Sequence, residues 1–299
     1  MALMSNQELL ELHIADKQAS WSARVGESNN ELKTTLLSHR EILALYEDEP
    51  ALDFTPDKLR KVQILMCDSG LSAPVVNKRI GRVRRSFRWA VARSLLPPEV
   101  LQGLMAVEPV RPPQAPLHPP IQCVSVEVVQ ATVDHMVDKQ KGTNVAGDIC
   151  RIMLLTGMRP GEATSMRGVD IKVNHDGLCS YSPQVHKNSW RYKTRTVQLG
   201  PKAQKIMMNY LNPGLLFTTK LGKKYSSHAL AQSVRRACRR AGVEPWSPNQ
   251  IRHTFATMAD SKCDLQTASE LLGHSDTKQT QRYLGRASKR SSEYVLEYA

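Results

Sequence analysis

The chain has 299 residues, which is long enough for two domains with sizeable cores. It carries 41 Lys and Arg against 28 Asp and Glu, a formal net charge of +13, and this balance favours a polyanionic partner, with nucleic acid as the first candidate. No apolar run reaches membrane-spanning length, and the N-terminus lacks the basic and apolar regions of a signal peptide.

The first module, residues 1–107, is predicted to be helical. Residues 1 to about 28 are polar and weakly patterned. The clearest helix begins near Pro74, because proline is favoured in a first turn, and it ends before Pro97. One apolar stripe at helical spacing runs along it and comprises Val76, Ile80, Val83, Phe87 and Ala90.

The same helix carries many basic side chains and no acidic one. On a helical wheel Trp89 falls among the basic residues, opposite the apolar stripe, and a basic face with an aromatic side chain suits a duplex backbone. The alternative is a solvated face with Trp89 covered by a neighbouring helix. The absence of acidic residues favours DNA contact, and the predicted DNA-binding residues are Lys78, Arg79, Arg82, Arg85 and Arg88.

A proline-rich stretch, residues 108–120, is predicted to be an extended linker, because neither a helix nor a central strand tolerates so many prolines. The second module begins near Ile121 and has helical patterns at 123–138 and 144–155. Short strands are predicted at 169–173, 178–187 and 195–199, and further helices follow Gly200. The predicted fold class is mainly α with a small antiparallel sheet in the C-terminal domain, an α+β fold.

Two arginines of the second module are candidates for binding a phosphate. Arginine suits a phosphodiester because its planar fork donates parallel hydrogen bonds and keeps its charge. Arg159 and Arg252 both lie beside apolar segments, and partly buried arginines need an anionic partner. Glu162 would serve Arg159 in the free protein. A surface charge is the alternative for either arginine alone.

Tyr283 is the candidate nucleophile, because the segment with Arg252 and then His274 precede it at fixed distances in the chain, and a second arginine, Arg159, lies much further upstream. A phenol has an unperturbed pKa of about 10, and neighbouring cations favour the phenolate. A phosphotyrosyl ester retains the energy of the cleaved bond, so that a DNA hydroxyl can later attack and reseal the strand. An aromatic ring that only packs is the alternative.

These motifs together resemble the tyrosine recombinase, or phage integrase, family. The matching segments are Thr156–Glu162, Asn249–Thr257, and Leu271–His274 followed nine residues later by Tyr283. The resemblance covers the C-terminal module, and the N-terminal module is more weakly similar to the family's helical core-binding domain. It implies a catalytic domain at 121–284 and a C-terminal tail at 285–299, which docks either on a neighbouring protomer or on its own domain.

The resemblance also implies a role for each matched residue. Arg159 and Arg252 would bind the scissile phosphate, and His274 would donate a hydrogen bond to it. Tyr283 would attack and leave a 3′-phosphotyrosine and a free 5′-hydroxyl. Lys187, at the predicted hairpin, would be the general acid for the leaving oxygen, with Lys193 as the competing candidate.

Asn249 departs from the family pattern, which usually has a histidine three residues before the second arginine. Asparagine can form a hydrogen bond to the nucleophile or the phosphate, but it cannot accept a proton as a base. His253 would lie on a different helix face from Arg252. We expect the change to be tolerated because electrostatic stabilisation outweighs the help of a base.

The sequence therefore predicts a site-specific DNA recombinase or integrase that acts on double-stranded DNA as a tetramer on two DNA sites. It shows no phosphate-binding GxxxxGK[ST] loop and no convincing metal cluster, so neither a nucleotide cofactor nor a metal is expected. The six scattered cysteines, without a CxxC pair, predict reduced thiols in the cytoplasm. The alternatives are a catalytically silent DNA-binding protein of a mobile element and a type IB topoisomerase-like enzyme.

Overall fold

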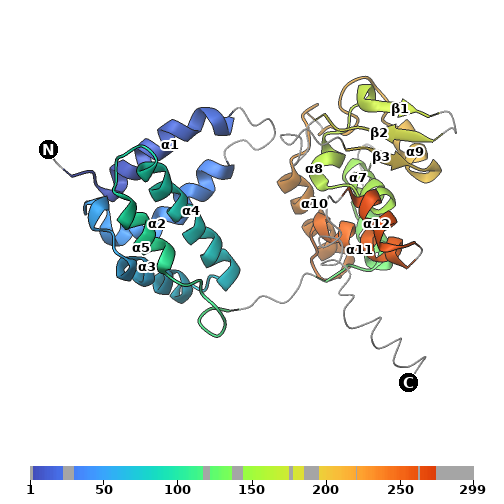
Figure 1. Ribbon diagram of the computed structural model, residues 1–299. Helices are drawn as coiled ribbons and strands as arrows, with labels where there is room; N and C mark the ends of the chain where they lie inside the picture. Colours follow the sequence, from blue (N-terminus) through green and yellow to red (C-terminus); the bar gives the residue numbers. More distant parts are fainter. Residues whose placement is uncertain are drawn as a thin grey trace. The chain divides into compact units, whose positions relative to one another are not determined.

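The computed structural model describes residues 3–22, 30–116, 122–136, 144–174, 178–184, 195–219, 221–261 and 263–273. The chain divides into two compact units, Met1–Pro120 and Ile121–Ala299 (Figure 1). Each unit is built around a hydrophobic cluster of its own. Within the described ranges, no helix is both long and apolar enough to cross a membrane.

The N-terminal unit is helical throughout its described part. Its central helix is α4 (Ala73–Val91), and the predicted apolar stripe of this helix is buried, which confirms the periodicity argument. Helix α4 contacts four of its neighbours (Figure 1). These neighbours are α1 (Asn6–Ser22), α2 (Asn30–Tyr46), α3 (Pro56–Asp68) and α5 (Pro98–Ala106), and a short 3-10 helix, η1 (Ala51–Asp53), precedes α3.

Helix α1 forms despite the weak sequence pattern of this segment. Its residues Leu9, Leu10 and His13 are buried, and the helix contacts α2 and α4. Trp89 of α4 is only 8% exposed, and its indole N–H donates to Asp16 of α1 over 3.0 Å. The prediction that Trp89 belongs to an open basic face is therefore wrong, because α1 covers it.

Part of the proline-rich stretch packs on the N-terminal unit. Val107, Val110 and Ala115 are buried in the hydrophobic cluster of this unit. The side chain of Asn77 on α4 donates to the Val110 carbonyl and accepts from the Val110 amide, both over 2.9 Å. The segment through Ala115 is therefore attached to α4, although its prolines exclude regular structure.

The C-terminal unit surrounds α7 (Val145–Thr156), whose buried face includes Ile149, Ile152 and Met153. Asn144 caps the start of this helix by accepting from the Gly147 amide over 3.0 Å. Helix α7 contacts helices on several sides as well as the sheet (Figure 1). The other helices are α6 (Val126–Asp134), α8 (Pro160–Thr164), α9 (Pro201–Met208), α10 (Ser227–Ala241), α11 (Pro248–Asp260) and α12 (Leu265–Leu272).

A three-stranded antiparallel sheet lies at the edge of this unit, in the order β1 (Ile171–Val173), β2 (Cys179–Tyr181) and β3 (Val197–Leu199) (Figure 1). A 3-10 helix, η2 (Gly168–Asp170), leads into β1. Tyr181 pairs with Ile171 on one side and Val197 on the other. The predicted fold class, mainly α with a small antiparallel sheet, is confirmed.

Candidate active site

The end of α7 brings the segment Thr156–Glu162 against the segment Asn249–Thr257, which lies on α11. Gly157 ends the helix in the left-handed region, with φ of 65°, and its amide donates to the Met153 carbonyl over 2.8 Å. A Cβ atom at this position would overlap the ring of Phe255 on α11. Only glycine therefore permits this helix end, which leads directly into Arg159, to lie so close to α11.

Arg252 on α11 connects all three motif segments. Its side chain is 2% exposed. Its Nη1 donates to the carbonyl of Gly157 and its Nη2 to the carbonyl of Leu272, each over 2.6 Å. One guanidinium therefore bonds to two segments that are far apart in the sequence. The first of these segments leads into Arg159, and the second leads into His274.

Arg159 forms the predicted partnership with Glu162. The Arg159 amide donates to Oε2 of Glu162, and its Nη1 donates to Oε1, both over 2.8 Å. The Arg159 side chain is 25% exposed, whereas that of Glu162 is 3% exposed. Solvent and a ligand can therefore reach this arginine, while the carboxylate behind it is enclosed.

The charge of Glu162 is retained despite its burial. Burial alone would raise the pKa of its carboxyl, but the hydrogen bond from the Arg159 amide and the charges of Arg159 and Arg195 outweigh it, so the pKa lies below its ordinary value. The guanidinium groups of Arg159, Arg195 and Arg252 and the one carboxylate of Glu162 together leave an excess of positive charge at the site. This excess suits an anion such as a phosphate.

Arg195 was missed as a candidate by sequence reasoning. It is 6% exposed, and its Nη2 donates to the Leu271 carbonyl over 3.1 Å. The signal that could have found it is the strand alternation, because Arg195 shares the buried face with Val197 and Leu199. A cation on the buried face of a strand needs a specific partner.

Residues 125–290, more than half of the chain, match the model of the phage integrase family. The chain belongs to this family. Tyrosine recombinase XerC from Corynebacterium glutamicum is 32% identical over 152 residues, which cover 48% of this chain and 47% of the relative. XerC from Pseudomonas fluorescens is 35% identical over 145 residues, which cover 45% and 46%. The chain spans about half the length of these curated relatives.

A longer match at lower identity supports the same family. Tyrosine recombinase XerD from Bifidobacterium longum is 25% identical over 253 residues, which cover 76% of this chain and 78% of the relative. Two solved structures share the fold. XerH site-specific recombinase bound to palindromic difH substrate has a TM-score of 0.73 at 16% identity, covering 99% of this chain and 98% of the other. A lambda integrase dimer bound to a COC′ core site has a TM-score of 0.73 at 15% identity, covering 92% and 97%.

Among the remaining residues predicted from the phage integrase pattern, the structure describes Asn249. Asn249 lies in the first turn of α11, where it is exposed. His253 is half-buried, and burial followed by the charge of Arg252 lowers the pKa of its imidazole, which is neutral at physiological pH. Lys187, Lys193, His274 and Tyr283 lie outside the described residues.

The predicted DNA-binding residues of α4 fall into two groups. Arg79 lies 3.2 Å from Glu41, and Arg82 and Arg85 lie 3.4 and 3.3 Å from Glu31, both glutamates being on α2. Lys78 and Arg88 are exposed. Although α4 itself carries no acidic residue, α2 supplies carboxylates to its basic face, a contact between helices that local sequence does not reveal.

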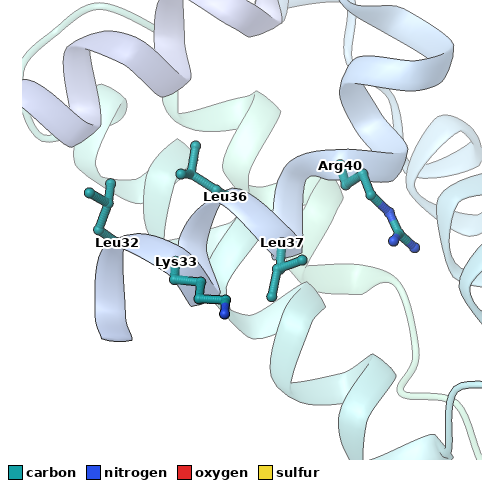
Figure 2. A pocket seen from close by; sticks show the side chains of 5 residues that line it. All are labelled: Leu32, Lys33, Leu36, Leu37 and Arg40. Carbon is teal, nitrogen blue, oxygen red and sulfur yellow. The ribbon is translucent and has the colours of Figure 1, made fainter. Parts of the chain in front are cut away.

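The N-terminal unit also has a shallow pocket along α2, which Figure 2 shows from close by. It is lined by Leu32, Lys33, Leu36, Leu37 and Arg40. None of the residues predicted for phosphate chemistry lies in it. In the part of the chain that the structure describes, no group of three or more His, Cys, Asp or Glu side chains is placed to bind a metal ion.

Proposed function

We propose that the protein is a site-specific DNA recombinase that cleaves and rejoins DNA strands through a 3′-phosphotyrosine intermediate. The observation that carries this proposal is the contact of Arg252 with both Gly157 and Leu272. This contact brings the segments that precede Arg159 and His274 to one buried guanidinium, that of Arg252. Membership of the phage integrase family and a fold seen in recombinases bound to DNA support the same reaction.

In the proposed reaction, Arg159 and Arg252 bind the non-bridging oxygens of the scissile phosphate and stabilise the charge that builds up in the transition state. The Tyr283 phenol oxygen attacks the phosphorus, and the bond to the 5′ oxygen breaks. His274 donates a hydrogen bond to the phosphate, and Lys187 supplies a proton to the departing oxygen. Asn249, exposed at the start of α11, contributes a hydrogen bond rather than base catalysis.

The proposed division of labour follows the two units. Residues 1–107 bind duplex DNA, residues 108–120 connect the units, and residues 121–284 carry the chemistry. Because each protomer cuts one strand, complete exchange between two duplexes requires a tetramer, with residues 285–299 as the candidate contact between protomers. Such a protein acts where chromosomal or mobile DNA is accessible, which in a bacterial cell is the cytoplasm.

Replacement of the proposed nucleophile tests this function. Full-length protein is incubated with nicked, labelled duplexes that tile the DNA on either side of its gene, and denaturant-resistant protein–DNA adducts are counted. We expect wild type to form adducts, Tyr283→Phe to form none while binding the same DNA, and the control Tyr225→Phe, at a tyrosine outside the matched motifs and the tail, to behave as wild type. Adducts with Tyr283→Phe would exclude this nucleophile. DNA binding by wild type without any adduct would support a silent DNA-binding protein instead.

A further inference from the structure

We propose that Arg195 is a positioning residue of the strand-transfer site, which orients the C-terminal end of α12 against the segment that carries Arg159. This inference deepens the proposed function and rests on it. Arg195 is not among the residues with an assigned chemical role. Three observations support this role: two join its side chain to the C-terminal end of α12, and the third is the effect of its charge on Glu162.

The first contact is the hydrogen bond to α12. Nη2 of Arg195 donates to the Leu271 carbonyl over 3.1 Å, across 76 positions of sequence. The last carbonyls of a helix have no partner within the helix, and the negative end of the helix dipole favours a cation there. The neighbouring Leu272 carbonyl accepts from Arg252 over 2.6 Å. Two buried guanidiniums therefore bind adjacent carbonyls of one helix end, and this fixes its direction as well as its position.

The second contact is with Gly273, which ends α12. This glycine has φ of 62°, and its amide donates to the Glu270 carbonyl over 2.8 Å. A Cβ atom at this position would overlap the guanidinium of Arg195. The arginine thus occupies the space that a side chain at position 273 would fill, one residue before the predicted phosphate ligand His274.

The third observation is electrostatic, because the positive charge of Arg195 helps to lower the pKa of the Glu162 carboxyl. This carboxylate interacts with the charges of both Arg159 and Arg195, and it forms two hydrogen bonds with Arg159. Removing the positive charge of Arg195 would leave Glu162 buried with less compensation, so that the carboxylate would depend more heavily on Arg159. Arg195 therefore shares the charge of Glu162 with Arg159, while its hydrogen bond to Leu271 holds the end of α12.

The test compares Arg195→Gln and Gly273→Ala with Gly242→Ala in the full-length protein. Gly242 is the matched control, because it ends α10 with φ of 66° and an added Cβ atom would meet nothing within 4 Å. All three variants are assayed for the rate constant of adduct formation at saturating DNA, for DNA affinity and for thermal unfolding. Hydrogen exchange of the α12 amides reports the helix end without requiring activity.

We expect Arg195→Gln and Gly273→Ala to slow adduct formation by about 10-fold to 100-fold, the scale of a misplacement on the order of 1 Å. Their DNA affinity should change little, and α12 should exchange faster than α11. Gly242→Ala should retain the wild-type rate. The double variant Arg195→Gln/Gly273→Ala should be no slower than Arg195→Gln alone, because the shorter side chain removes the overlap at position 273.

A wild-type rate of adduct formation in folded Arg195→Gln would overturn the proposal, as would a loss confined to DNA affinity. If Arg195→Gln fails to fold, Gly273→Ala measured against Gly242→Ala decides, and equal rates for these two would reject the positioning role. If wild type itself forms no adduct, the proposed function fails. Hydrogen exchange of the α12 amides in the variants then still shows whether Arg195 orients this helix end. Exchange at the wild-type rate would reject the positioning role as well.

Discussion

The carboxylate of Glu162 is buried and interacts with the charges of Arg159 and Arg195. Replacing this single residue therefore measures how much its charge stabilises the folded protein. Glu162→Gln keeps the shape but removes the charge that Arg159 and Arg195 face. We expect the free energy of unfolding at neutral pH to fall by about 1–3 kcal/mol, because Arg159 loses a charged acceptor. Urea denaturation of the two proteins measures the difference.

The pH dependence of this difference has a definite sign. The pKa of Glu162 in the folded protein lies below its ordinary value of 4.5, so its stabilising contribution is present above pH 4.5 and is lost as the pH falls through the folded-state value. The stability of wild type and Glu162→Gln should therefore converge in acid. The exposed Glu244 provides the control. A gap that stays constant with pH, or one as small as that for Glu244→Gln, would contradict the prediction.

At the scale of elements, the packing of α1, α2 and α4 encloses two histidines. Burial lowers the pKa of His13 and of His39 to about 4 from 6.5, and for His13 the charge of Lys17 acts in the same direction. His13 lies 2.9 Å from the Ser86 hydroxyl, and His39 bonds to the Thr35 carbonyl over 2.9 Å. Both rings are therefore neutral in the folded protein at physiological pH, because burial disfavours the charged form.

These histidines should make the N-terminal unit sensitive to acid. Between pH 6.5 and about 4 the unfolded chain binds protons that the folded chain excludes, so the free energy of unfolding falls as the pH falls. The slope is about 1.4 kcal/mol per pH unit for each proton taken up. Denaturation across this range should give a shallower slope for His39→Gln, whereas the exposed His228 should be replaceable by Gln without effect. Equal slopes for both variants would contradict the prediction.

At the scale of the whole molecule, the net charge of +13 should make binding of the proposed DNA partner strongly dependent on salt. Affinity should fall steeply between about 50 and 200 mM salt, because phosphate contacts release counterions. Replacing the exposed Lys78 and Arg88 of α4 with Gln should reduce the slope of log affinity against log salt by about one for each lost phosphate contact. Fluorescence anisotropy with labelled duplex DNA measures the slope.

Lys61 of α3 is the matched control for this measurement. Its side chain is 63% exposed in the same unit, but it lies outside the basic helix α4. Lys61→Gln should leave the salt slope at the wild-type value. An unchanged slope for the Lys78→Gln/Arg88→Gln variant would remove α4 from the DNA-binding surface and would direct attention to the basic residues of the C-terminal unit.

Several elements could be predicted from local sequence because local physics decides them. The stripe from Val76 to Ala90 recurs at helical spacing, and α4 buries it as expected. The short alternating segments near 171, 179 and 197 form the three strands. The partnership of Arg159 with Glu162 was also predictable, because the two residues are three positions apart at the start of one helix. The motif set itself was specific enough to indicate the family.

The tertiary structure decided what depends on segments that are distant in the chain. Helix α1 has little periodicity of its own, and it is stabilised by packing on α2 and α4. Trp89 is buried because α1 covers it, and Asp16 of that helix, 73 positions earlier, accepts its N–H. Arg195 reads as an ordinary strand residue until Leu271 and Gly273 are found beside its guanidinium. A buried charge is determined by its partners, and when those partners are distant in sequence only the folded chain identifies them.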